Sequence, residues 1–153
     1  MDYLLDTNIL IIYSRESKVA NNIESDHTIL GGGNDVAVSI VTLGELNSLT
    51  KQFRYGEKRK NRIGQMLGQL YEIDINIREI IDRYGEIDAF SQGRLAGKAL
   101  RDSSRNMGKN DIWIAATASV FDMTLVTTDR DFEHLDGVYL KLKYIDWKEY
   151  NRS

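Results

Sequence analysis

Short apolar runs alternate with amphipathic stretches along most of this chain. Four of these runs are short and bounded by polar residues, as buried strands are, and they cover residues 3–5, 36–41, 124–127 and 138–145. Between them, apolar residues recur at helical spacing, for example at Ile63, Met66, Leu67, Leu70 and Tyr71. The alternation predicts an α/β fold with a mostly parallel sheet of about five strands and helices on both faces.

The remaining segments carry weaker signals. Alternating isoleucines over residues 73–77 indicate a short strand near an edge of the sheet. We expect one or two helices over residues 78–105, with a break near Gly85, and a turn with a short helix over residues 129–135. Residues 17–35 are polar, and their glycine-rich end is interpreted as a loop because it lacks the lysine and hydroxyl residue of a phosphate-binding loop.

Composition limits the classes of protein to consider. The chain has 153 residues, of which 42% are hydrophobic and 28% charged, so we expect one globular domain over residues 1–153. It has no cysteine, which excludes disulfides and thiolate zinc sites. Asp2, Asp6 and Asn8 interrupt the first apolar run, and no basic region precedes it, so a cytoplasmic protein without signal peptide or membrane span is expected. The net charge of −3 indicates that any contact with nucleic acid is local.

Four acidic residues stand at the starts of predicted helices, and three of them follow a short apolar run. They are Asp6, Glu45, Asp111 and Asp129. Because functional residues of an open α/β sheet collect beyond the carboxyl ends of its strands, we expect these acids to converge on one pocket. A site made only of carboxylates suits Mg²⁺ or Mn²⁺, which activate water and neutralise charge when a phosphodiester is cleaved.

Each acid alone also has a purely structural explanation. Glu45 completes a capping-box pattern with Thr42, and Asp6, Asp111 and Asp129 are typical helix caps or first-turn acids. Read together, however, all four lie near buried segments, where an isolated carboxylate is costly unless it is paired or binds a metal.

Other chemistries have less support. The only histidines, His27 and His134, are interpreted as surface or capping residues, and the chain has no serine elbow for a nucleophilic triad. A carboxylate pair of a glycosidase remains an alternative, although it would not need four acids at the starts of elements.

A basic segment over residues 51–62 contains six lysines and arginines, with Phe53 and Tyr55 between them. It is either a solvated connection or a patch that follows an RNA or DNA backbone. Trp113 is interpreted as a core residue rather than as a platform on which a base stacks. The candidates for RNA contact are Lys58, Arg59, Lys60, Arg62 and, near the third acid, Lys109.

Four segments around the acids resemble the motifs of the PIN-domain ribonucleases, and most closely of their VapC-like toxin branch. In order, these segments are residues 5–8 (LDTN), 39–46 (SIVTLGEL), 110–118 (NDIWIAATA) and 125–132 (LVTTDRDF). The resemblance makes Asp6, Glu45, Asp111 and Asp129 the metal-site acids, with Asp131 as an alternative to Asp129. It implies that Thr7, Asn8 and Thr128 support them.

The resemblance further implies an α/β/α sandwich, a homodimer, Mg²⁺- or Mn²⁺-dependent cleavage of RNA, and often an antitoxin partner. One departure is Leu49, where many of the toxins have glycine four residues after the second acid. The hypothesis is therefore a metal-dependent endoribonuclease, in which Asp6 and Asp111, together with Glu45 and Asp129, hold one or two metals. The alternative is a catalytically silent PIN-like module that binds RNA or a protein.

Overall fold

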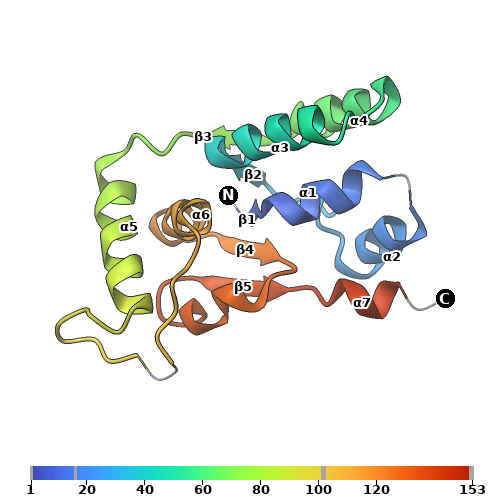
Figure 1. The fold of residues 1–153 in the computed structure, drawn as a ribbon. Coiled ribbons are helices and arrows are strands. Elements are labelled where there is room, and N and C mark those ends of the chain that lie inside the picture. The colour runs from blue at the N-terminus through green and yellow to red at the C-terminus, as the bar shows by residue number, and fades with distance from the viewer. Residues whose placement is uncertain (1, 16, 101–102, 152–153) are drawn as a thin grey trace.

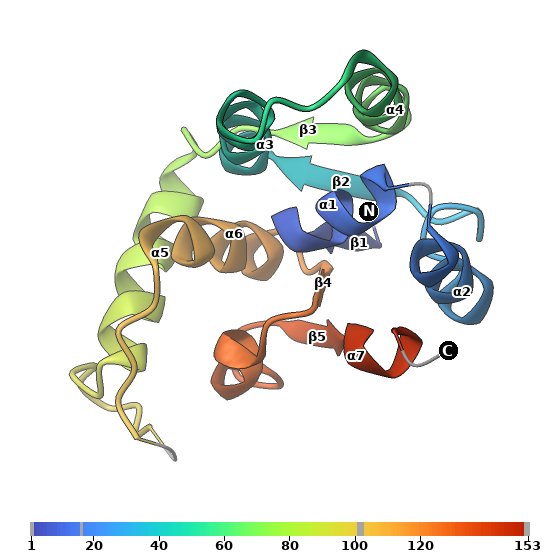
Figure 2. The same ribbon diagram turned by 45° about the vertical axis from the view of Figure 1, so that its right-hand side comes forward.

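The computed structural model describes residues 2–15, 17–100 and 103–151. At its centre is a sheet of five parallel strands in the order β3-β2-β1-β4-β5 (Figures 1 and 2). The predicted parallel sheet is confirmed, and β3 lies at an edge as predicted, but of the predicted strand over residues 73–77 only Ile73 belongs to it. The strands are β1 (Tyr3–Leu5), β2 (Val36–Ser39), β3 (Tyr71–Ile73), β4 (Thr124–Thr127) and β5 (Lys141–Tyr144).

Helices cover both faces of the sheet, because successive strand residues point in opposite directions. Leu4 and Leu125 pack in one core with α5 (Arg78–Ser91) and α6 (Lys109–Val120). Leu5 and Val126 pack in a second core on the other face, which confirms the three-layer α/β/α arrangement. No helix within the described ranges is both long and apolar enough to cross a membrane. The second face is covered by α1 (Thr7–Ser14), α2 (Lys18–His27), α3 (Ile40–Gln52), α4 (Glu57–Leu67) and α7 (Trp147–Tyr150).

The junction between β2 and α3 differs from the prediction. β2 ends at Ser39, and α3 begins one residue later because Ser39 Oγ accepts a hydrogen bond from the Val41 amide at 3.1 Å. Thr42 lies inside the first turn of α3 and is fully buried. The predicted capping box of Thr42 and Glu45 is therefore wrong, and helix capping does not explain Glu45.

The polar pattern of residues 17–35 predicts no helix, yet α2 forms there. Ser17 Oγ accepts from the Ala20 amide at 3.2 Å and caps the helix, while Ala20 and Ile23 are buried. Two buried residues are too few to produce a clear helical period, but they suffice when a cap and tertiary packing support the helix. The break predicted near Gly85 is also wrong, because α5 continues through that glycine.

Other boundaries differ by a few residues. Helix α4 ends at Leu67, so Leu70 and Tyr71 lie outside it despite their helical spacing. The described residues between α5 and α6 form no helix, although part of this segment was predicted to be helical. The predicted short helix after β4 is confirmed as the 3₁₀ helix η1 (Arg130–Leu135).

Two arginines of α4 tie this helix to the end of α1. Arg59 Nε donates to Ser14 Oγ at 2.9 Å, and Arg62 Nη1 donates to the Ser14 carbonyl oxygen at 2.8 Å. The Arg59 guanidinium also lies 3.7 Å from the centroid of the Tyr55 ring. Because the last carbonyls of a helix have no partners within it, the Arg62 bond satisfies one at the end of α1, and the Arg59 bond fixes the Ser14 side chain there. They hold in place the helix that follows Asp6.

Replacing Arg59 tests this contact. Arg59→Ala should lower the free energy of unfolding by about 1–2 kcal/mol, because it removes a hydrogen bond to the buried Ser14 hydroxyl and a cation–π contact. The adjacent Lys60 pairs with Glu57 at 2.7 Å on the surface, so Lys60→Ala should cost less than about 1 kcal/mol. Urea unfolding of both variants measures the difference, and equal losses would contradict the role assigned to Arg59.

Candidate functional site

The four acids meet at the carboxyl edge of the sheet. Asp6 directly follows β1, and Asp129 follows β4, the neighbour of β1. Glu45 lies in α3, the helix that leaves β2 on the other side of β1. Asp111 is in the first turn of α6. Because all the strands are parallel, their carboxyl ends share one edge, where the acids come together.

Asp6 is the most buried of the acids and is held by two donors. Its side chain is only 4% exposed. Its Oδ1 accepts from the Thr7 amide at 2.8 Å, and its Oδ2 accepts from the Thr127 hydroxyl at 2.7 Å. Thr127 Oγ1 in turn accepts from the Asp129 amide at 3.0 Å. One chain of hydrogen bonds therefore connects the first and fourth acids.

Glu45 reaches across to α1. The Thr7 hydroxyl donates to Glu45 Oε1 at 2.7 Å, and the same hydroxyl lies 3.2 Å from Thr42 Oγ1. Thr7 thus contacts Asp6 through its amide and orients Glu45 through its side chain. A helix cap has no need of such a contact between α1 and α3.

The pKa values show that the acids influence one another. Burial raises the pKa of the Asp6 carboxyl to about 6, although its hydrogen bonds from Thr127 and Thr7 act in the opposite direction. Burial also raises the pKa of Asp111 to about 7, and further contributions come, in decreasing order, from Asp6, Asp129, Glu45 and Asp131. Asp111 therefore lies in the combined negative potential of the other acids, as expected if they share one pocket.

The capping explanation applies to two of the acids. Asp6 caps α1, and Asp129 caps η1 through Oδ1, which accepts from the Asp131 amide at 2.9 Å. Asp111 is not the cap of α6, because that position is occupied by Gly108, but it is the first-turn acid that the structural explanation also allowed. Capping thus accounts for neither Asp111 nor Glu45. The exposed Asp131 stays an alternative to Asp129.

The donor set of this edge fits a hard divalent cation by its chemistry. It offers only oxygen ligands, which Mg²⁺ and Mn²⁺ prefer. Within the described ranges, no three His, Asp or Glu side chains already form a coordination set. The fit therefore rests on ligand type and on the mutual repulsion of the acids, which a cation would relieve.

The supporting residues differ from the predicted set. Thr7 contacts both Asp6 and Glu45. Asn8 is exposed and lines, with Thr128, a separate cavity of about 250 Å³. The missed residue is Thr127, which bonds Asp6 directly. The sequence does not tell Thr127 from the adjacent Thr128, because only the direction of the side chains at the end of β4 decides which of the two reaches Asp6.

Comparison with known proteins identifies the family of the chain. Residues 3–138 match the model of the PIN domain. The chain belongs to the PIN domain family. Ribonuclease VapC2 of Rickettsia felis is similar, with 27% identity over 144 residues, 92% of this chain and 97% of that protein. The resemblance found in the four motifs is thus confirmed.

Solved structures share the fold of this PIN domain. VapBC2 of Rickettsia felis, bound to a DNA fragment from its promoter, aligns with a TM-score of 0.71 and 25% identity over 94% of this chain and 98% of that chain. VapBC-1 of nontypeable Haemophilus influenzae aligns with a TM-score of 0.65 and 23% identity over 97% of this chain and 99% of that chain.

The residues predicted to contact RNA lie on two elements of the PIN domain. Arg59 and Arg62 hold α1, which already explains their presence in α4. Lys109 begins α6 and is exposed, two residues before Asp111. Lys58 and Lys60 are exposed on α4. Contact with RNA stays a prediction for all five residues.

The interpretation of His134 as a surface or capping residue is wrong. His134 is buried, its Nε2 lies 2.7 Å from Ser91 Oγ, and its ring stacks on Phe90. It helps to join η1 to α5. His27 lies 2.9 Å from the Tyr150 hydroxyl and joins α2 to α7.

The raised pKa values predict how stability depends on pH in the metal-free protein. Because the pKa of Asp111 is about 7 in the folded state, against 3.8 for the unperturbed group, its contribution to stability is present at low pH and lost as pH rises through about 7. Asp111→Asn should therefore gain stability relative to wild type at pH 8 but not at pH 4. Urea unfolding in EDTA at both pH values measures this, with the exposed Glu72→Gln as control. A pH-independent difference would contradict the shared acidic pocket.

Proposed function

We propose that this protein is a divalent-metal-dependent endoribonuclease that hydrolyses RNA phosphodiesters. Its metal-site and catalytic residues are Asp6, Glu45, Asp111 and Asp129, which hold one or two Mg²⁺ or Mn²⁺ ions. The convergence of these carboxylates at one sheet edge, where burial and then the other acids raise the pKa of Asp111, is the observation that carries the proposal. An acid cluster of this kind is unfavourable for the fold alone and is typical of a functional site.

The residues of the chain have distinct tasks in this site. Asp6 is fixed by Thr7 and Thr127, so its carboxylate keeps one position. The Thr7 hydroxyl orients Glu45 from the opposite helix. A divalent cation, when bound, supplies an acidified water and neutralises charge on the phosphodiester. The raised pKa of Asp111 means that this carboxyl releases its proton near neutral pH.

The relatives support the nuclease proposal and suggest a biological role. One relative is named as a ribonuclease, one similar structure is of VapBC2, and another is of a toxin–antitoxin complex from Klebsiella pneumoniae, with a TM-score of 0.62. We infer that this chain is the toxin of such a pair, acts as a homodimer, and has an antitoxin as its protein partner. RNA contact by Lys109, Lys58 and Lys60 belongs to the same proposal.

Metal binding should stabilise the protein through these acids. Mg²⁺ or Mn²⁺ that binds only the native state adds RT ln(1 + [L]/Kd) to the free energy of unfolding, so the melting temperature rises with metal concentration. Asp111→Asn should abolish that rise, whereas Glu72→Gln on the exposed surface of β3 should keep it. Thermal melts at increasing metal concentration provide the measurement. A full response in the Asp111→Asn variant would mean that the metal binds elsewhere.

Glu45→Gln separates catalysis from structure. A glutamine can still accept the hydrogen bond from Thr7, so the variant should fold, with a melting temperature in EDTA no lower than that of the wild type. RNA cleavage should fall by about two orders of magnitude or more, because the negative ligand is lost. The control is Glu57→Gln, an acid in the first turn of α4. If wild type itself cleaves no RNA with either metal, the silent binding module is the better description.

A further inference from the structure

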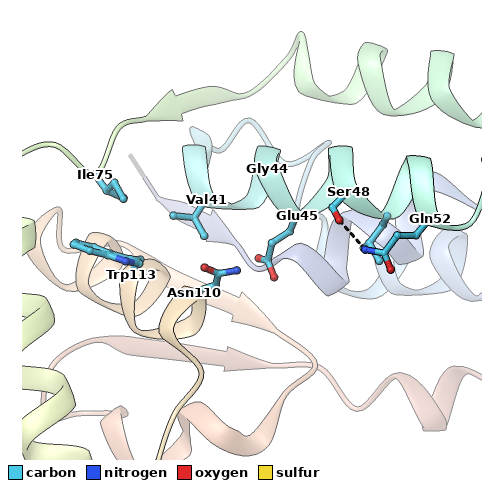
Figure 3. Close-up of a pocket in the computed structure, with 9 residues that line it drawn as sticks. Val41, Gly44, Glu45, Ser48, Gln52, Ile75, Asn110 and Trp113 are labelled. Carbon is cyan, nitrogen blue, oxygen red and sulfur yellow. Dashed lines mark hydrogen bonds between the residues drawn. The ribbon is translucent and has the colours of Figure 1, made fainter.

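A groove runs beside the acid cluster between α3 and α6. Its volume is about 560 Å³, within the range of small-molecule sites. Figure 3 shows Glu45 and Asn110 directed toward each other across the groove from these two helices. Asn110 immediately precedes Asp111, so any occupant of the groove lies next to the acids.

One end of the groove is aromatic and apolar. Trp113 is half-buried, and its ring packs on Tyr84 with 4.2 Å between the centroids. Val41 from α3 and Ile75 line the same end of the groove as the Trp113 indole of α6 (Figure 3). The indole therefore has a fixed position and still faces the groove. The interpretation of Trp113 as a core residue holds in part, because Trp113 packs against the core while it also lines the groove.

The other end of the groove is polar but carries no positive charge. Asn110 offers amide donors and acceptors, and Gln52 Nε2 donates to Ser48 Oγ at 2.7 Å. Gly44 leaves the facing side of α3 open, since a Cβ there would meet nothing within 4 Å. Glu45 is the sole ionisable side chain among the described residues that line the groove. Such a surface suits a neutral, planar ligand with a polar edge better than a phosphate or an acidic peptide.

We propose that this groove binds one nucleobase of the RNA strand. The base stacks on Trp113, and its polar edge bonds to the Asn110 amide, which sets the base next to the phosphodiester at the acids. Stacking on an aromatic ring and bonding of base edges are the usual ways in which proteins bind single-stranded RNA. The inference rests on the proposed function, because it assigns a subsite to the same RNA substrate.

Trp113 fluorescence tests the subsite without any cleavage. Trp147 is the other tryptophan, so in the Trp147→Phe background the emission reports on Trp113 alone. The protein is titrated in EDTA with adenosine, guanosine, cytidine and uridine, and with ribose as control. We expect saturable quenching by at least one nucleoside and none by ribose. Quenching by none of the four, or equal quenching by ribose, would overturn the proposal.

Variants then assign the contacts. Asn110→Ala in the same background should weaken nucleoside binding. Calorimetry should show that Trp113→Leu lowers the affinity for the nucleoside about tenfold or more, whereas Trp113→Phe retains binding. The control Phe53→Leu removes an aromatic ring that is 68% exposed and lies outside the groove. Thermal melts check that each variant is folded. Equal affinity of the Leu and Phe variants of Trp113 would contradict stacking.

Sedimentation equilibrium tests whether a second copy of the chain, and not a nucleobase, occupies the groove. If the groove were covered by a second copy of the chain, Trp113→Leu would weaken self-association and nucleosides would not quench the dimer, which would overturn the proposal. The nuclease is tested separately. Metal-dependent cleavage without nucleoside binding rejects only the subsite, whereas nucleoside binding without cleavage rejects the nuclease and keeps the groove as a base-binding site.

Discussion

The buried carboxylate of Asp6 joins the central strand β1 to its neighbour β4, and the acid cluster is built on the ends of these strands. A charge in this position costs several kcal/mol unless donors surround it. The Thr7 amide and the Thr127 hydroxyl provide those donors, and the Asp6 amide itself donates to the Val126 carbonyl at 2.9 Å. Backbone and side chain of one residue thus bind β4 to the end of β1. Since Thr127 also holds the Asp129 amide, the position of the fourth acid depends on the first.

Asp6 and Asp111 tolerate burial in different ways. For Asp6, hydrogen bonds offset part of the cost of burial, and its pKa rises only to about 6. For Asp111, burial and four neighbouring carboxylates act in the same direction, and its pKa rises to about 7. An asparagine would fill the Asp111 position without this repulsion. The acid at this position is therefore better explained by the binding of a positive charge than by the stability of the fold.

The sequence could predict the acid cluster because topology alone brings it together. Parallel strands place every strand end at one edge, so Asp6, Glu45 and Asp129 needed only a correct reading of three short apolar runs. Local patterns misled where side-chain direction decides. Thr42 and Glu45 have capping-box spacing, but Ser39 caps the helix, and Thr42 is turned toward Thr7.

Features that depend on tertiary packing were less visible in the sequence. Helix α2 depends on two buried residues and a cap, and His134 is buried because Phe90 and Ser91 from α5 lie beside it. Neither contact has a local signature, since the partners are far apart in the chain. Similarly, Arg59 and Arg62 belong to a basic run by sequence but to the end of α1 by contact.

Helices α3 and α6 each contribute both an acid and a wall of the groove. Neighbouring residues of a helix point in different directions, which lets Asn110 face the groove while Asp111 faces the acids. Fully buried alanines, among them Ala115, fix α6 closely on the sheet. The distance from the groove to the acids is thus set by rigid elements and not by a loop. An RNA strand held at both places would be positioned by the same two helices that carry Glu45 and Asp111, so the choice of base and the choice of scissile bond would be coupled in the fold itself.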